Sequence, residues 1–293
     1  MSLRHGEFAI NGFRFGCGHV IDVSTLQATS VRWRVQDQPN PVGDNILMGR
    51  DFGDPQPIKL GILVKGSDPE SAQQGVDAFT NAWATARNRG PSQESVLEIG
   101  VRGSTLRAYG RPRDLDIDDT PLFTQSRGTG QATFERSNML FYGDGRAAGG
   151  GSVVLPITPP QAAGMTFPIV FPWATLEGGQ RRGIVENTGI RPTNDVVITI
   201  KGPIDHPVVR GAGWTLDLDT SLKYDQSVVI NARARTVRRN DGASLAGALT
   251  RGSRLGNVVV PPGTSEFFFS GVDVTGSATA TIQWNSAYTS LGV

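Results

Sequence analysis

The chain has little of what builds disulfides, metal sites or membrane spans. Its 293 residues include a single cysteine, Cys17, which excludes an intramolecular disulfide and a cysteine-based zinc site. The most apolar stretch, residues 165–176, is interrupted by Pro168 and Pro172 and is too short to cross a bilayer. The opening MSLRHGEFAING also lacks the apolar core of a secretory signal. We therefore expect a protein that is made in the cytoplasm, stays in solution and does not insert into a membrane.

A charge excess of either sign is missing too. The 28 basic and 27 acidic side chains leave a net charge of +1, so bulk electrostatics draws the chain neither to nucleic acid nor to an anionic membrane. Only four of the basic residues are lysines. Arginine is favoured at protein interfaces, and a GC-rich genome gives the same bias, so the two explanations are compatible. The 37 glycines and 18 prolines are typical of a turn-rich, mainly β protein.

No set of residues predicts an enzyme. None of the histidines lies in an HExxH pair, and the sequence contains neither a GxSxG elbow nor a glycine-rich phosphate loop. Asp217 and Asp219 suggest a pair of glycosidase carboxylates, but such pairs normally come from different strands. The acidic run at 114–119 lacks the glycine and glutamate that an EF-hand needs. We predict no catalytic site, no metal and no cofactor.

Apolar and polar residues alternate along most of the chain, and this pattern predicts half-buried strands of a sandwich or barrel. In the segment 58–65, one face collects Ile58, Leu60, Ile62 and Val64. The same alternation recurs at 97–101, 214–218 and 278–284.

One segment, residues 68–89, breaks this period. Its apolar residues recur at intervals of four and three, namely Ala72, Val76, Phe79, Trp83 and Ala86. This spacing predicts one face of an amphipathic helix. Ser67 or Asp68 can cap it, and Ser67 and Glu70 have the spacing of a capping box. A single helix among strands should pack on a sheet, so we expect Phe79 and Trp83 in the core.

Two stretches look irregular. Residues 36–57 hold four prolines and three glycines and are too long for a tight hairpin turn. Loops of this length are usually functional or disordered. Residues 143–152, GDGRAAGGGS, have the composition of a flexible linker. We place the domain boundary there, which gives domains at 1–146 and 147–293.

The order of these segments carries a resemblance to a known family. FxINGxxFG at 8–16 is followed by an alternating strand at 31–35, the long loop, the helix, YGRPRDLDI at 109–117, FERSNMLFYGDG and, near the end, SATATIQWNSAYTSL. Each motif is short, but together they resemble the distal tail or minor tail proteins of siphophages, especially those that infect actinobacteria.

The resemblance implies a mainly β protein of two domains. The first would be a tail-tube-like β-sandwich or split barrel with one flanking helix, and the second a galectin-like β-sandwich. Six copies would form a ring at the tail tip of the virion, assembled in the host cytoplasm. The implied partners are the tail tube protein, the tape measure protein and other tail-tip proteins, with DNA only as passing cargo.

The resemblance also suggests where the ring contacts lie. Tube-fold proteins use the loop that corresponds to 36–57 for contacts within or between rings. Here Asp44, Arg50, Asp51 and Asp54 would form intersubunit pairs. The competing possibility is a loop that is disordered in the free protein.

The alternative function is a host-surface carbohydrate-binding module in the second domain. Asn231 and Arg233 lie close together, as in the galectin signature, but no histidine precedes them. Trp214 and Trp284 occupy alternating apolar positions and are better interpreted as core than as a platform for a sugar.

Overall fold

The computed structural model describes residues 3–91, 93–143, 151–157, 182–273 and 275–292. The chain divides into two compact units: unit 1 comprises Met1–Ala148 with Tyr288–Val293, and unit 2 is Gly149–Ala287. The predicted domain boundary lies within a few residues of the first division. At the other end the structure differs, because the prediction assigns the last six residues to the second domain and the structure places them in unit 1.

Two predicted features fall partly or wholly outside the described residues. These are the linker at 143–152, of which 144–150 are not described, and the apolar stretch at 165–176. Within the part of the chain that is described, no helix is long and apolar enough to cross a membrane.

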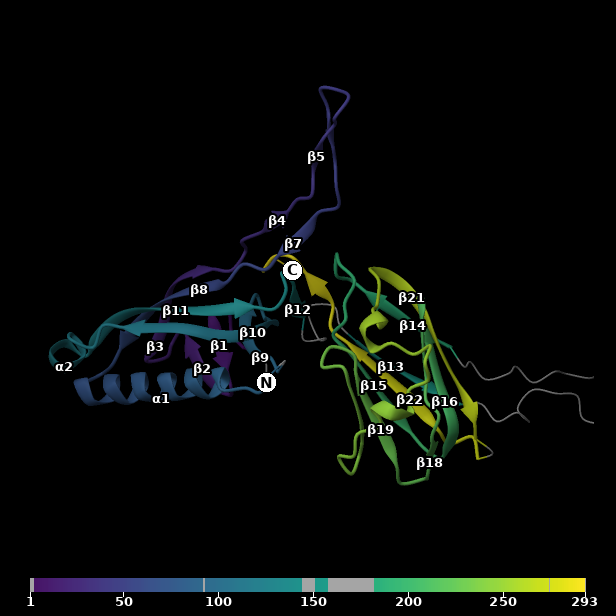
Figure 1. Ribbon diagram of the computed structural model, residues 1–293. Coiled ribbons are helices and arrows are strands. Elements are labelled where there is room, and N and C mark those ends of the chain that lie inside the picture. Colours follow the sequence, from purple (N-terminus) through teal and green to yellow (C-terminus); the bar gives the residue numbers. More distant parts are fainter. Residues whose placement is uncertain (1–2, 92, 144–150, 158–181, 274, 293) are drawn as a thin grey trace, which may run out of the picture. The chain divides into compact units, whose positions relative to one another are not determined.

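Unit 1 is built on one antiparallel sheet (Figure 1). Its strands are β1 (Glu7–Ile10), β2 (Phe13–Gly16), β3 (Ile21–Gln27), β8 (Ile58–Lys65), β9 (Ser95–Val101), β10 (Ser104–Ile117), β11 (Arg127–Arg136), β12 (Phe141–Gly143) and β23 (Ala287–Tyr288). The main path runs β2-β1-β9-β10-β11-β8-β3, while β12 pairs with β10 and β23. The end strands of this path, β2 and β3, follow each other in the chain and contact each other.

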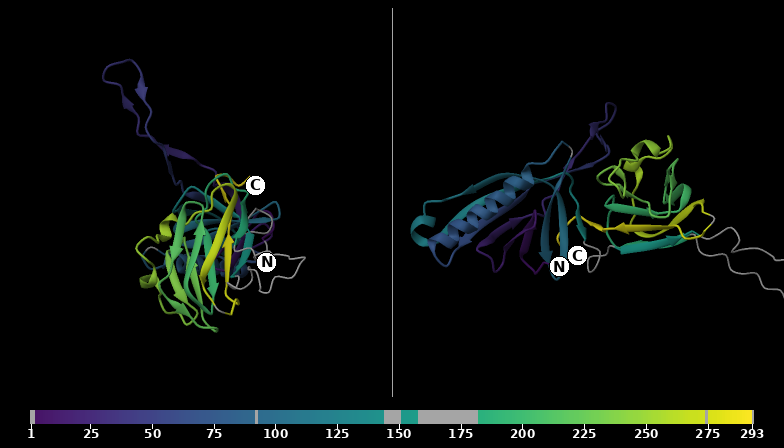
Figure 2. Two further views of the ribbon diagram at one scale, coloured as in Figure 1. Left: turned by 90° about the vertical axis from the view of Figure 1, so that its right-hand side faces the viewer. Right: turned by 90° about the horizontal axis from the view of Figure 1, so that it is seen from below.

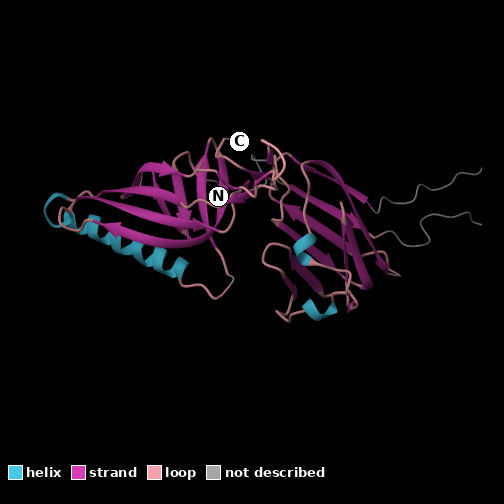
Figure 3. Ribbon diagram, turned by 45° about the horizontal axis from the view of Figure 1, so that its top comes forward, coloured by secondary structure: helices cyan, strands magenta, loops and turns pink. Residues whose placement is uncertain are grey.

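A long helix, α1 (Pro69–Arg87), lies lengthwise against this sheet (Figure 3). Its buried residues are the five of the predicted stripe, Ala72, Val76, Phe79, Trp83 and Ala86. Phe79 packs its ring on Phe15 of β2 at 5.0 Å and on Trp83 at 5.5 Å. The predicted capping box is one residue off, because Asp68 is the N-cap and pairs with Ser71. A short helix, α2 (Leu122–Gln125), precedes β11.

Unit 2 is a β-sandwich of two five-stranded sheets (Figure 2). One sheet has the order β13 (Gly151–Pro156), β22 (Thr279–Trp284), β15 (Val196–Lys201), β19 (Ser227–Asn231), β20 (Thr236–Arg239). The other has the order β14 (Arg182–Asn187), β21 (Gly263–Val272), β16 (Ile204–Gly211), β17 (Trp214–Asp217), with β18 (Ser221–Leu222) paired to β16. Two 3-10 turns, Ala246–Ala248 and Leu255–Asn257, precede β21.

The core of unit 2 lies between the two sheets. Ile198 and Ile282 from one sheet and Leu216 and Phe269 from the other belong to one cluster of fully buried residues. Trp214 and Trp284 are buried as predicted, and each indole donates to a backbone oxygen, of Val259 at 2.9 Å and of Glu186 at 3.2 Å. The prediction of a mainly β chain, with one flanking helix and a C-terminal sandwich, is confirmed.

Candidate assembly surface

Residues 29–57 form a long ribbon, here called the arm, that projects from the sheet of unit 1 (Figure 1). In it β4 (Arg32–Arg34) pairs with β7 (Phe52–Asp54), and β5 (Gln38–Pro39) pairs with β6 (Ile46–Leu47). The interpretation of 36–57 as an irregular loop is therefore wrong. The ladder is broken into pieces of two and three residues, and Pro39 occupies a strand that pairs on one side only.

Arg136, at the end of β11, holds the base of the arm together. It is only 3% exposed, and its guanidinium donates to the backbone oxygens of Gln56 at 2.6 Å and of Ser30 at 3.3 Å. A third bond reaches the oxygen of Met139 at 3.4 Å, and the guanidinium lies 5.0 Å from the centroid of the Phe141 ring. One buried cation thus joins the outgoing and returning strands of the arm to the body of unit 1.

A glycine lets the arm approach the body of unit 1. A Cβ at Gly53 of β7 would lie 1.9 Å from the sulfur of Met139. No side chain fits in that space unless Met139 moves. Gly53 thus brings the returning strand into contact with the same segment that Arg136 bonds.

The surface of the arm is unusually apolar for an exposed element. Its exposed large apolar side chains are Val31, Trp33, Val35, Val42, Ile46, Leu47, Met48 and Phe52. Val42 at the tip is 92% exposed and Met48 is 80% exposed. The predicted alternating strand at 31–35 is present at Arg32–Arg34, and its apolar residues Val31, Trp33 and Val35 are all exposed to solvent. Contiguous exposed apolar residues of this kind mark interaction surfaces.

Local polar contacts shape the arm. At the tip, Asn40 and Asn45 bond through their main chains at 3.1 Å and through their side-chain amides at 2.6 Å. Lower down, the amide of Gly49 donates to Asp37 at 2.9 Å. The guanidinium groups of Arg34 and Arg50 both lie over the ring of Phe52, at 5.7 and 5.4 Å from its centroid.

The four predicted interface residues all lie on the arm but do not form one cluster. Asp44 is in the tip turn, Arg50 and Asp51 lie between β6 and β7, and Asp54 is in β7 opposite Arg32. Within the described chain none of the four is in an ion pair, so their charges are available to a neighbouring molecule. Their role at an interface stays a prediction, and the sequence analysis did not single out the exposed apolar residues between them.

Unit 2 contains no arrangement that resembles a catalytic centre among its described residues. Asp217 ends β17, while Asp219 beyond it is exposed and lies 3.3 Å from His206, which is exposed as well. In the part of the chain that is described, no three or more histidine, cysteine or acidic side chains are grouped so that they could hold a metal ion.

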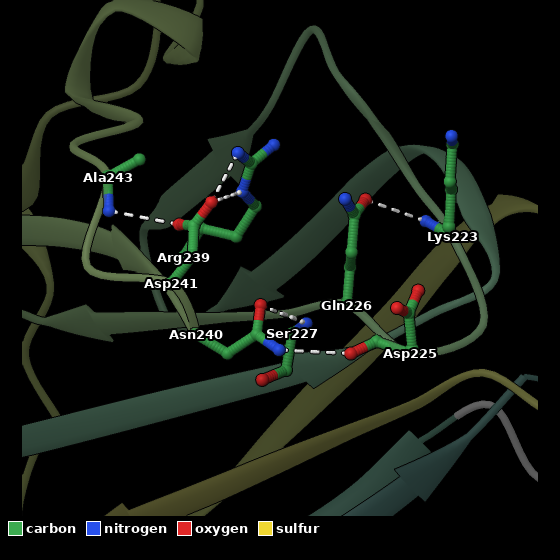
Figure 4. A network of polar contacts seen from close by, with 8 residues as sticks. All are labelled: Lys223, Asp225, Gln226, Ser227, Arg239, Asn240, Asp241 and Ala243. Carbon is green, nitrogen blue, oxygen red and sulfur yellow. Dashed lines mark hydrogen bonds and ion pairs between the residues drawn. The ribbon is translucent and has the colours of Figure 1, made fainter.

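Four arginines lie close together in the sequence, Arg233, Arg235, Arg238 and Arg239, and one of them, Arg239, forms an ion pair with Asp241 (Figure 4). Arg239 donates to Asp241 at 3.0 Å, and Asp241 in turn accepts from the amide of Ala243 at 3.0 Å. These bonds hold the pKa of Asp241 down to about 2, with the Arg239 bond as the largest cause. Nearby, the side-chain amide of Asn240 donates to the backbone oxygen of Asp225 at 3.0 Å. Local hydrogen bonds thus stabilise the residues that flank the β19–β20 hairpin.

Comparison with known structures identifies the fold of the chain. The Dit protein of phage SPP1, described as a paradigm of the hub adsorption apparatus in phages that infect Gram-positive bacteria, superposes with a TM-score of 0.59. The match covers 95% of this chain and 98% of that chain, at 10% identity. The chain has the fold of a phage distal tail protein.

Two further structures similar to this chain come from the baseplate of phage P2 in its activated conformation. The structure with Ca matches with a TM-score of 0.60 at 12% identity, over 95% of this chain and 97% of that chain. The structure with Sr matches with a TM-score of 0.61 at 12% identity, over 94% and 97%. No protein-family model and no curated protein matches the sequence.

Proposed function

We propose that the chain is a structural protein of a phage tail tip. Six copies form a ring that connects the tail tube to the tip or baseplate proteins and leaves a channel through which DNA passes. The observation that carries this proposal is the Dit-like fold over 95% of the chain. A likeness that spans both units supports a shared architecture of the whole molecule, beyond a single common domain.

The proposed partners follow from a position between tube and tip. They are the tail tube protein, the tape measure protein and other tail-tip proteins, with DNA as transient cargo. The chain is assembled into the virion in the host cytoplasm, and its role involves no catalytic turnover. The support for a non-enzymatic role is that the similar structures are a hub protein and a baseplate.

The arm supplies the contact between copies in this proposal. In a closed ring each copy presents one surface to the neighbour on one side and a different surface to the neighbour on the other side. The exposed apolar residues of the arm would be covered by such a neighbour, which stabilises the ring by about 25 cal/mol for each Å² buried. Asp44, Arg50, Asp51 and Asp54 would pair with charges of that neighbour and select its register.

The mass and symmetry of the purified protein test the ring. Light scattering should give about six times the chain mass of 31.3 kDa, and negative-stain microscopy should show six-fold particles with an open centre. Rings can need a neighbouring protein to assemble, so the measurement is repeated with the tail tube protein added. A chain that stays monomeric in both preparations contradicts the proposal.

A pair of matched substitutions tests the arm. Leu47→Asp places a charge on an exposed apolar position of the arm, at 50% exposure, and should abolish the ring without unfolding the chain. Phe123→Asp makes the same kind of change at a 74% exposed position in α2, outside the arm, and should leave the ring intact. If both variants formed rings equally well, the result would contradict the proposal that the arm forms the contact between copies.

A further inference from the structure

Unit 2 contains a cavity of about 760 Å³ on the outer side of the sheet formed by β14, β21, β16 and β17. Its wall includes one row of side chains across three strands, because Arg210 of β16 is paired with Phe268 of β21 and with Thr215 of β17. The preceding row, Val209, Leu216 and Phe269, is fully buried in the sandwich core. The row of Arg210 therefore faces away from the core.

The opposite wall is the segment that contains Gly252, Arg254 and Asn257. Bonds to β17 hold this segment in place: the Ser253 hydroxyl accepts from the amide of Asp217 at 2.8 Å. The amide of Thr250 also donates to the oxygen of Asp217 at 3.0 Å. The cavity is consequently formed before any ligand arrives.

Trp214 is part of the wall and is itself held rigidly. Its indole donates to Val259 at 2.9 Å, and its ring meets Phe267 edge-on with centroids 5.4 Å apart. Gly211 leaves room for this ring, since a Cβ there would lie 2.4 Å from it. Trp214 thus belongs to the core side of β17, and contacts with the core fix the part of the cavity that it reaches.

The charge of the cavity is positive. Arg210 and Arg254 are both exposed, and neither forms an ion pair within the described residues. The residues that line the cavity include no aspartate or glutamate. The outward acidic residue of β21, Glu266, pairs with Arg182 at 3.5 Å. Two guanidinium groups are thus left to a ligand.

These groups define a class of ligand. A guanidinium binds a carboxylate or a phosphate through two parallel hydrogen bonds. The hydroxyl of Thr215 and the amide of Asn257 can both donate to and accept from the hydroxyls of a ligand. The ring of Phe268, 42% exposed, offers a flat apolar face to a ring of C–H groups. The volume also falls in the range of about 300–1,000 Å³ that holds small molecules.

We propose that this cavity binds a sugar unit that carries a carboxylate or a phosphate. A charged group would meet Arg210 and Arg254, hydroxyls would meet Thr215 and Asn257, and the sugar ring would lie on Phe268. An acidic peptide would satisfy the arginines, but it would not use the flat apolar ring of Phe268. The inference is independent of ring formation, because every residue involved belongs to unit 2.

Calorimetry on the full chain tests the proposal with four probes. These are trigalacturonic acid, glucose 6-phosphate, the neutral methyl β-galactoside and an oligoglutamate peptide. Either acidic sugar should bind at least tenfold more tightly than the neutral sugar, and its affinity should fall as salt is raised. The stronger of the two acidic sugars identifies the source of the negative charge. Preference for the peptide, or equal affinity for charged and neutral sugars, would overturn the proposal.

Substitutions place the binding in the cavity. Arg210→Gln and Arg254→Gln should each weaken binding of the acidic sugar at least tenfold. Phe268→Ala should also weaken binding, but the affinity that remains should still fall as salt is raised, because both arginines are intact. Arg238→Gln removes the same charge from an exposed position on β20, in the other sheet, and should have no effect. Circular dichroism confirms that each variant is folded. Undiminished binding by both Arg210→Gln and Arg254→Gln would sink the assignment.

Discussion

The side chain of Arg136 bonds the backbone oxygens of Ser30 and Gln56, which are 106 and 80 residues away in sequence. These two oxygens lie where the arm leaves the sheet and where it returns. The orientation of the arm consequently depends on a residue outside it. Burial lowers the pKa of the Arg136 guanidinium, but the ordinary value is so high that the group stays charged.

We expect Arg136→Met to destabilise unit 1. It leaves three backbone oxygens without their donor, and a lost buried network of this kind costs about 2–4 kcal/mol. Urea unfolding gives the free energy, and hydrogen exchange should show faster exchange at the base of the arm. Arg127→Met, at the exposed other end of β11, is the control and should change stability by no more than about 0.5 kcal/mol.

The pKa of Asp241, at about 2, should rise toward its ordinary value in Arg239→Gln, because Arg239 supplies the largest of the bonds that lower it. The pKa is measured by NMR titration of the carboxyl carbon. Since the folded-state pKa lies below the unfolded value, this contact stabilises the fold fully above about pH 4. Its contribution is lost as pH falls through about 2. Arg238→Gln should leave the titration of Asp241 in place, and an equal shift in both variants would contradict the specific bond.

The N-cap of α1 gives a third expectation. Asp68 accepts from the amide of Ser71 at 2.8 Å, and this bond is the main cause that lowers the pKa of Asp68. Asp68→Ala should lower the urea midpoint of unit 1. Asp68→Asn should lower it much less, because asparagine also caps helices well. The advantage of aspartate over asparagine should vanish as pH falls below the ordinary carboxyl range. An alanine variant as stable as the asparagine variant would show that the cap contributes nothing.

Gly211 should be intolerant of a side chain. A Cβ there would lie 2.4 Å from the Trp214 ring and 3.0 Å from Phe267, so Gly211→Ala must displace one of them. We expect a loss of about 1–3 kcal/mol in unit 2 and altered tryptophan fluorescence. Gly256→Ala, where no atom lies within 4 Å of the added Cβ, is the matched control and should be close to neutral. Similar stabilities for the two variants would mean that the Trp214 and Phe267 rings can move aside at little cost in free energy.

Sequence patterns predicted the elements that pack on a core. The apolar stripe from Ala72 to Ala86 repeats over several helical turns, and the alternation in 58–65 repeats along the whole strand. The sequence therefore shows which face of each element is apolar. The arm was missed for the opposite reason. Its ladder pieces are only two or three residues long, and its large apolar side chains remain exposed on the surface of the unit.

The contacts of Arg136 and the cavity of unit 2 could not be predicted from the sequence, because each brings together residues that are far apart in the chain. The contacts of Arg136 span most of unit 1, and the cavity brings Arg210 together with Arg254 and Phe268 from separate elements. The register in which strands pair determines which distant residues become neighbours. The alternation of apolar and polar residues does not by itself specify that register. The sequence places Asp44 and Asp54 on the same segment but gives no geometry that relates them, and their role at an interface stays a prediction.

The return of the chain to unit 1 has a consequence for synthesis. Tyr288, only 8% exposed, joins the core of unit 1, and β23 completes the sheet beside β12 after all of unit 2 has been made. Unit 2 is thus a cassette inserted within unit 1. On the ribosome, the first core must wait for its last strand while roughly half the chain is translated, and the second can close first.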